Sequence, residues 1–438
     1  MKIKPIDVHG VLSKYLIVDG FDLVLDLKKS KGSRIFDSKR RKFMLDCFSF
    51  FATSPLGCNH PKLTTPEYIK YLGEIAVNNP TNSDLYTVEM AEFVDSFYKY
   101  AVPDCFKHLF FIAGGALAIE NGLKTAFDWK VRKNIDGGMS NHLGKQVIHF
   151  KEAFHGRSGY TLSLTNTFNV NKIRFFTKFN WPRITNPKIK FPLNSKNLEE
   201  VMELEKKAIM EIENAIDQNP DDIACLVIEP IQGEGGDNHF RKEFFLKLSK
   251  ICNENEIMFM VDEIQSGVGL TGKMWAYEHF EFEPDIVAFG KKTQVCGIMV
   301  GKKVDEVKDN VFNVSSRLNS TWGGNLIDMV RCQKYLEIID EENLIKNADE
   351  EGKYLLEGLE GISERYPIIS NARGRGLMCA FDLPTPEKRD EIRNKLYSNN
   401  LIVLGCGATT IRFRPPLNIT SEEIEEALEI VNKTARNF

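Results

Sequence analysis

Residues 258–265 read MFMVDEIQ and residues 287–292 read VAFGKK, and these two segments decide the fold. Each is a short apolar run that ends on charged residues, and such runs are typical of strands buried on both faces of a sheet. In α/β proteins, ligands bind at the carboxyl ends of these strands. Asp262 and Lys291 lie roughly 30 residues apart, about the length of one strand, helix and strand. We therefore expect the two side chains to be neighbours at one edge of a sheet.

An acid and a lysine at one sheet edge suit pyridoxal 5′-phosphate. This cofactor forms a Schiff base with a lysine, and its ring nitrogen needs an anionic partner to stay protonated. Taken singly, each residue has a simpler explanation, because charged residues are mostly exposed. Asp262 would then be a turn residue and Lys291 a solvated surface lysine. The motifs around the pair favour the cofactor.

Composition places the chain among ordinary globular proteins. It has 438 residues, 42% hydrophobic and 27% charged, enough for a large core and more than one domain. Its 57 basic and 61 acidic residues give a net charge of −4, which predicts no binding to nucleic acid or membranes. The first eight residues lack the apolar run of a signal peptide, and no segment has the roughly 20 apolar residues of a membrane span. We expect a cytoplasmic protein.

Cysteine and histidine usage points to no metal site. The nine cysteines are scattered and never form a C-x-x-C pair, and the eight histidines show no ligand spacing. In a chain expected in the cytoplasm, such cysteines are reduced thiols.

The pattern of apolar residues predicts two domains. Residues 1–64, with strand-like runs at 16–18, 23–25, 34–37 and 43–46, would be the N-terminal part of a small domain. Residues 65–330 would form a large cofactor-binding α/β domain, and residues 331–438 the C-terminal part of the smaller α+β domain. In the large domain, seven strands with interleaved helices predict a mostly parallel sheet. Its expected strands are 108–112, 146–150, 173–176, 224–229, 257–262, 286–289 and 298–300.

The helical pattern is clearest in four stretches. Residues 199–216 and 242–253 are expected helices of the large domain, and 386–398 and 421–437 of the small one. Residues 326–366 form one long helical stretch that leads from the large domain into the small one.

Other motifs offer groups for an anionic, flat ligand. Gly115 and Ala116 follow the first large-domain strand, where backbone amides and a helix dipole bind phosphate, although turn glycines are common without one. Phe154 follows the next strand and either covers the face of a flat cofactor or packs in the core. Arg157 offers a planar fork for a carboxylate.

Three further motifs place charged or hydroxyl groups in the same region of the fold. Glu234 lies in a glycine-rich loop, and it either pairs with an arginine or is solvated. Thr321 precedes a helix, as a phosphate donor or as a cap. Arg412 and Arg414 interrupt an apolar strand, so one of them is expected to point inward, at a cost unless it binds an anion.

These motifs, in this order, resemble the class III (omega) aminotransferases of pyridoxal phosphate fold type I over nearly the whole chain. The segments VDEIQSG at 261–267 and PDIVAFGK at 284–291 are highly specific to that family. The motifs EPIQGE at 229–234, FHGR at 154–157 and T-x-G-G-N at 321–325 leave little room for chance.

The resemblance implies roles around the cofactor. They are Lys291 as the Schiff-base lysine and proton shuttle, Asp262 at the pyridine nitrogen, Gln265 at the phenolic oxygen, Phe154 stacked on the ring, and the Gly115 and Ala116 amides on the phosphate. Thr321 would reach the phosphate from the other subunit, which implies a homodimer with shared sites.

The resemblance also implies the substrates. The ε-amino group of L-lysine would pass to 2-oxoglutarate, giving L-glutamate and 2-aminoadipate 6-semialdehyde, which cyclises to piperideine-6-carboxylate. Arg412 would pair with Glu234 when lysine binds and would open for the α-carboxylate of the acceptor. Arg157 would bind the distal carboxylate of both substrates, and Asn319 would line the pocket, as would the loop at 51–54.

Two departures from the family pattern favour L-lysine as the amine donor over ornithine and 4-aminobutyrate. Gly114 stands where most relatives have a hydroxyl residue, and Leu117 where most have a glutamate. The open alternatives are another omega-aminotransferase acting on ornithine, 4-aminobutyrate or a diamine, an aminomutase on the same fold, and a non-catalytic binding protein.

Overall fold

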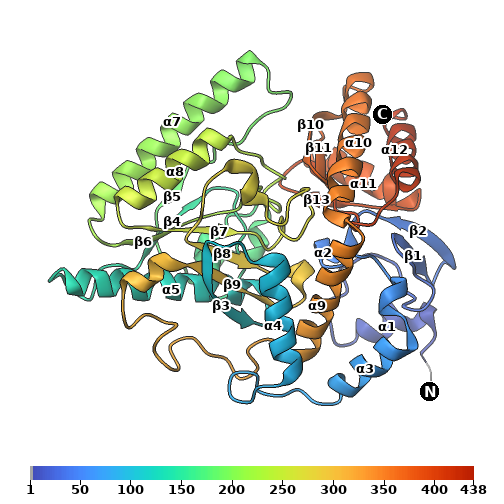
Figure 1. Cartoon of the computed structure of the whole chain (residues 1–438). Helices are drawn as coiled ribbons and strands as arrows, with labels where there is room; N and C mark the ends of the chain where they lie inside the picture. The colour runs from blue at the N-terminus through green and yellow to red at the C-terminus, as the bar shows by residue number, and fades with distance from the viewer. Residues whose placement is uncertain (1–2) are drawn as a thin grey trace.

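Strands made almost wholly of apolar residues need cover on both faces, and the computed structural model, which describes residues 3–438, gives them that cover (Figure 1). Every residue of β6 (Ile223–Ile228) and β7 (Met258–Asp262) is buried. The complete sheet runs in the order β3 (Phe106–Ile112), β9 (Cys296–Gly301), β8 (Ile286–Phe289), β7, β6, β4 (Gln146–Phe150) and β5 (Arg183–Ile184). Strand β9 is antiparallel to both neighbours and the other pairs are parallel. The predicted seven-stranded, mostly parallel sheet is confirmed.

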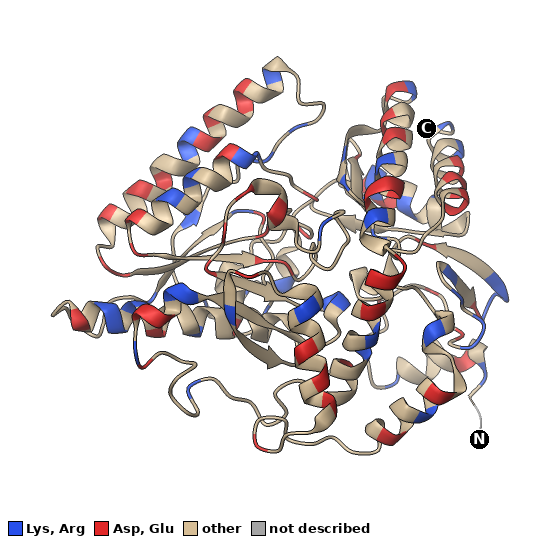
Figure 2. Ribbon diagram, viewed as in Figure 1, with Lys and Arg blue, Asp and Glu red and all other residues tan. Residues whose placement is uncertain are grey.

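Helices cover the two faces of this sheet. Helix α5 (Gly115–Asp136) packs along β9, β8 and β6, whereas α8 (Lys242–Glu254) packs on β7 and α7 (Ser195–Gln218) on β5. Figure 1 shows α5 on one side of the sheet and α7 and α8 on the other. Both charge signs are interspersed along α7 and α8 (Figure 2), as expected for helices with one face in water.

The strand predicted at residues 173–176 is wrong. This segment follows a short 3-10 turn, η3 (Val170–Lys172), and Phe175 is exposed with a left-handed backbone (φ 67°). The seventh strand is β5, whose two residues pair with His149 and Phe150 of β4. So short an edge strand is defined by its partner, and it leaves no periodic pattern in the sequence.

The two ends of the chain meet in one smaller region. Strands β1 (Arg34–Asp37) and β2 (Lys42–Asp46) join β12 (Leu401–Ile402) in a three-stranded sheet. A four-stranded sheet has the order β10 (Ser370–Arg375), β11 (Met378–Asp382), β14 (Thr410–Phe413) and β13 (Leu404–Cys406). The runs at 16–18 and 23–25 form no regular strand; only Leu25 makes a bridge, to Asp37.

The long helical stretch of the sequence is two helices. Helix α9 (Leu326–Glu341) ends before Asn343, whose left-handed backbone (φ 53°) turns the chain into α10 (Leu344–Arg365). The other helices are α1 (Val8–Leu12), α2 (Ser49–Ala52), α3 (Pro66–Ala76), α4 (Val88–Ala101), α6 (Thr161–Leu164), α11 (Pro386–Ser398) and α12 (Ser421–Ala435). Within residues 3–438, no helix is long and apolar enough to cross a membrane.

The domain boundaries proposed from the sequence stay predictions. The one at 330 lies inside α9, and residues 1–2 of the first segment lie outside the described range.

Candidate active site

The ends of the central strands bring buried acids together. Asp262 is the last residue of β7, and Glu229 directly follows β6. One oxygen of Asp262 accepts a hydrogen bond from Nδ1 of His155 at 2.8 Å, and the other accepts one from the backbone nitrogen of Ile264 at 3.0 Å. His155 comes from the loop after β4, so adjacent parallel strands supply all three groups.

The charges of this cluster depend on one another. Burial lowers the pKa of His155, but its hydrogen bond to Asp262 and the charge of that carboxylate outweigh burial, and the net pKa lies above the ordinary value. Burial raises the pKa of Glu229 above its ordinary value, against the opposing effect of His155. The contact with Asp262 therefore favours the protonated form of His155. Its Nε2 has no hydrogen-bond partner among the described residues.

Lys291 follows β8 and begins the short 3-10 turn η5 (Lys291–Thr293). Burial lowers the pKa of its amine to about 8, and the charge of Arg412 acts in the same direction. A lysine with a depressed pKa has more neutral amine at neutral pH, which is the nucleophilic form. Lys292 instead donates to the backbone oxygen of Gln265 at 2.8 Å. Of the two lysines, only Lys291 lines the cavity described next.

A cavity of about 430 Å³ lies over these strand ends. Its volume is within the range of pockets for small molecules. It is lined by residues from several elements, among them six that the sequence predicts: Gly115, Ala116, Phe154, Asp262, Gln265 and Lys291. Helix α5 begins here at Gly115 without a side-chain cap. Its first backbone amides are thus available to an anion.

Two arginines and two acids lie behind Gln265, a residue that lines the cavity. The Gln265 side-chain oxygen accepts from Arg412 at 3.1 Å and from Arg414 at 3.0 Å. Arg412 also donates to one oxygen of Glu234 at 3.3 Å, and Arg414 pairs with Asp237 at 2.8 Å. Arg412 is buried at 3% exposure, as expected for one of the two arginines, and Arg414 is buried as well, at 1%. Arg414 lies just beyond β14, so strand alternation does not apply to it.

Five predicted residues do not line this cavity: Arg412 and Glu234 adjoin it through Gln265, and the other three lie apart from it. Arg157, Asn319 and Thr321 are exposed, and none of them is among the described residues that line it. Asn319 and Thr321 belong to the loop that precedes α9. Their roles stay predictions.

The structure adds residues that the motifs alone did not assign. His155 and Glu229 lie within the FHGR and EPIQGE segments, so a closer reading of those motifs would have included them. The side chain of Gln294, another such residue, donates to the backbone oxygen of Thr53 at 2.7 Å. Both residues line the cavity, and Thr53 belongs to the loop at 51–54 that the sequence analysis expected there. Lys172 contacts Glu234, and no sequence signal marked it.

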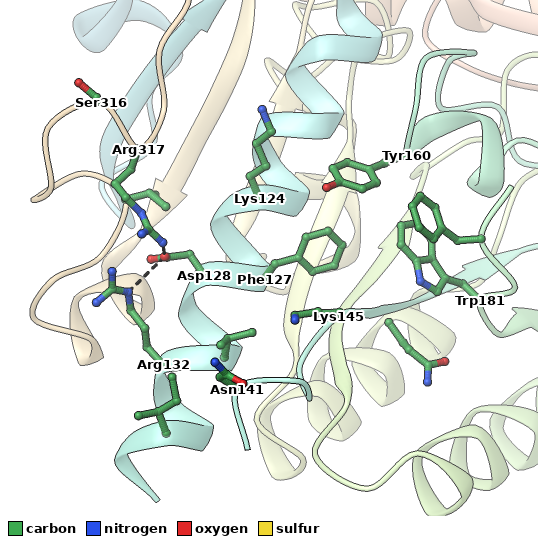
Figure 3. Close-up of a pocket in the computed structure, with 15 residues that line it drawn as sticks. Lys124, Phe127, Asp128, Arg132, Asn141, Lys145, Tyr160, Trp181, Ser316 and Arg317 are labelled. Carbon is green, nitrogen blue, oxygen red and sulfur yellow. Dashed lines mark hydrogen bonds and ion pairs between the residues drawn. The ribbon is translucent and has the colours of Figure 1, made fainter. Parts of the chain in front are cut away.

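A larger cavity, of about 1040 Å³, lies along the outer side of α5 (Figure 3). Aromatic residues such as Phe127, Tyr160 and Trp181 line it, and Arg132 and Arg317 both pair with Asp128 beside it. It contains none of the predicted site residues, so cavity size does not identify the active site here.

Known proteins resemble the chain over almost its whole length. The family model described as aminotransferase class-III matches residues 18–435. An L-lysine-epsilon aminotransferase of Mycobacterium tuberculosis is 50% identical over 98% of this chain and 95% of its own, and that of Amycolatopsis lactamdurans is 48% identical over 97% and 94%. The human mitochondrial 4-aminobutyrate aminotransferase is 32% identical over 94% and 84%.

The solved structures agree with the sequences. The lysine aminotransferase from M. tuberculosis in the internal aldimine form superposes with a TM-score of 0.97, at 49% identity, covering 99% of this chain and 100% of that one.

Pyridoxal 5′-phosphate is the cofactor of this fold and family, and the cavity offers what each part of it requires. The uncapped amides of α5 suit the phosphate, the Asp262 carboxylate suits a protonated ring nitrogen, and the amine of Lys291 suits the aldehyde carbon. With this site and with a family model matched over residues 18–435, the chain belongs to the class III aminotransferases.

Proposed function

We propose that the protein transfers the ε-amino group of L-lysine to 2-oxoglutarate, forming L-glutamate and 2-aminoadipate 6-semialdehyde, which cyclises to piperideine-6-carboxylate. The relatives that are 48–50% identical carry the name L-lysine-epsilon aminotransferase. The observation that carries the proposal is the contact between Glu234 and the buried Arg412, next to Lys291. Such a pair answers the main difficulty of using these two substrates in one pocket.

That difficulty is one of charge. Next to its reacting amine, lysine presents a hydrocarbon chain, whereas 2-oxoglutarate presents a carboxylate next to its reacting carbonyl. Arg412 suits the carboxylate, but a buried cation without a partner costs about 3–5 kcal/mol. Glu234 neutralises Arg412 while lysine is bound, and the acceptor carboxylate replaces Glu234. We assign the distal carboxylate of both substrates to Arg157, and part of the pocket lining to Asn319.

The residues around Lys291 divide the remaining work. When bound, pyridoxal phosphate supplies an electron sink for the negative charge left by loss of a proton from carbon. Lys291 takes that proton as a neutral amine and returns it. Asp262, oriented by His155, holds a positive charge at the ring nitrogen, and Phe154 and Gln265 hold the ring in place.

We further propose a homodimer with shared sites. Thr321 and Asn319 are exposed in this chain and lie away from its own cavity, as residues that serve a partner's site would. The proposed setting is lysine catabolism in the cytoplasm, in keeping with the expectation from composition.

The experiment that tests the function follows one nitrogen atom. Lysine labelled with heavy nitrogen only at the ε position is mixed with 2-oxoglutarate and the holoenzyme, and the glutamate formed is analysed by mass spectrometry. Labelled glutamate is the expected result. Unlabelled glutamate would show transfer from the α position, and no glutamate would point to another donor, with ornithine and 4-aminobutyrate tried next.

A further inference from the structure

The carboxylate of Glu234 has a second cation partner besides Arg412. Its Oε2 accepts from Arg412 at 3.3 Å, and its Oε1 accepts a shorter hydrogen bond from the ammonium of Lys172. Lys172 ends the turn η3, on the segment between α6 and β5. Its ammonium also lies 5.7 Å from the ring centroid of Phe154, a wall of the Lys291 cavity. Lys172 thus lies next to the cavity and contacts the residue that pairs with Arg412.

The three charged groups differ in exposure. The side chain of Arg412 is 3% exposed, that of Glu234 20%, and that of Lys172 32%. Glu234 therefore stands between a buried cation and a partly hydrated one. A rotation that releases Arg412 moves the carboxylate towards Lys172 and water, where its charge stays compensated.

The backbone at Glu234 is fixed by its neighbours. Its carbonyl oxygen accepts from the backbone nitrogen of Gly407 at 2.8 Å. The next residue, Gly235, packs so closely that a Cβ there would lie 2.1 Å from the backbone oxygen of Glu152. Release of Arg412 must then occur by rotation of the Glu234 side chain alone, and the position of its partners decides where that side chain rests.

We propose that Lys172 is a positioning residue that holds Glu234 away from Arg412 when a dicarboxylate binds. The inference rests on the proposed function, because it assigns a role in acceptor binding. Lys172 bonds one oxygen of Glu234 and Arg412 the other, and the bond to Lys172 remains when the dicarboxylate takes Arg412. Without Lys172, Arg412 is the only cation bonded to Glu234 among the described residues. A dicarboxylate must then displace Glu234 from Arg412 without help. Lys172 acts through Glu234 and does not touch the substrate.

Equilibrium binding tests the inference without turnover. Glutarate carries both carboxylates of the acceptor but no reactive group, and its Kd for the holoenzyme is measured by calorimetry. Lys172→Met should raise that Kd about fivefold, the upper range for a partly exposed ion pair. Lys172→Arg keeps the cation and should restore most of the affinity.

A double-mutant cycle shows whether the effect passes through Glu234. In a Glu234→Gln background there is no carboxylate to hold, so Lys172→Met should then change the Kd of glutarate by less than about twofold, the usual additivity error. An undiminished fivefold effect there would mean that Lys172 binds the ligand directly, and no effect in the native background would also overturn the inference.

Single-turnover kinetics adds a second readout. In Lys172→Met, the ratio of kcat/KM for the glutamate half-reaction to that for the lysine half-reaction should fall about fivefold, because only the dicarboxylate needs Arg412 released. Equal losses in both half-reactions would indicate a merely structural role. The matched control is Lys178→Met, an exposed lysine of the same segment with no ion pair to any described residue. The glutarate cycle needs no lysine, so it stays informative if the proposed donor is wrong.

Discussion

Lys291 and Lys292 are adjacent in sequence, but their surroundings give them different roles. Lys292 is buried and Lys291 is half-buried, and loss of contact with water lowers the pKa of each amine. The amine of Lys292 donates a hydrogen bond to the backbone oxygen of Gln265, whereas Lys291 lines the cavity, near Asp262 and Arg412. A sequence with two lysines at a strand end cannot reveal which is reactive. The contacts assign that role to the first.

The pKa of Lys291 predicts a pH dependence for cofactor uptake. With a pKa of about 8, the neutral amine increases about tenfold between pH 7 and pH 9, whereas an ordinary lysine would give about a hundredfold increase. The rate at which the cofactor-free protein binds pyridoxal phosphate should rise about tenfold over this range and then level off. Stopped-flow absorbance measures it. Lys292→Met, checked for folding by its melting temperature, should follow the same profile, and a hundredfold rise in the native protein would contradict the assignment.

At the scale of elements, the loop after β4 packs closely against the first turn of α5. Gly156 has a positive φ of 120°, and a Cβ there would lie 2.5 Å from the Cβ of Ala116 in the first turn of α5. The close contact holds the N-terminus of the helix against the cavity. A side chain at position 156 would displace the amides proposed to bind phosphate.

Gly156→Ala should therefore weaken phosphate binding. We expect backbone strain to lower the free energy of unfolding by about 1–3 kcal/mol. The affinity of the cofactor-free protein for pyridoxal phosphate should fall about tenfold. Affinity for pyridoxal, which lacks the phosphate, should change much less. Fluorescence titration measures both. Gly159→Ala is the matched control, because a Cβ there meets only the end of the Glu120 side chain, at 3.5 Å; equal losses for the two ligands would argue against the role of the helix N-terminus.

Elements with a strong local pattern could be predicted closely. The strand at 286–289 and the helix at 386–398 have the bounds expected from the sequence. The strand is an apolar run, and the helix begins at Pro386 after the N-cap residue Thr385, so both signals are local. Strands β5, β10 and β13 escaped prediction. Residues 370–375 read SNARGR, and such a polar segment becomes a strand only through its neighbour β11. Pairing of this kind is a property of the tertiary structure.

The candidate site divides in the same way. Motif residues such as Asp262 and Lys291 end strands, so their meeting follows from the parallel order of the sheet. The contact of Lys172 with Glu234 joins two irregular segments. No periodic pattern in the sequence predicts this contact, which forms only in the folded chain.

At the scale of the whole molecule, the site is assembled from both ends of the chain. Thr53 comes from the N-terminal segment, Arg412 from β14 and Lys291 from the centre of the large sheet. Strands β2 and β12 join the two termini in one sheet, which holds the contributions of the small region against the large one. A site divided among distant segments is one to which a second subunit can add further residues.

The proposed dimer predicts complementation between two inactive variants. Lys291→Ala removes the reactive amine, and Thr321→Asp places a negative charge where we expect the partner's phosphate, so each homodimer should be nearly inactive. Co-expressed with two different affinity tags and purified through both, the heterodimer carries one site with an intact Lys291 and an intact Thr321 from the other chain. Its activity should be about half that of the native dimer, because one of two equivalent sites is complete. If Thr321 served its own chain's site, both sites would be defective and the heterodimer would stay inactive.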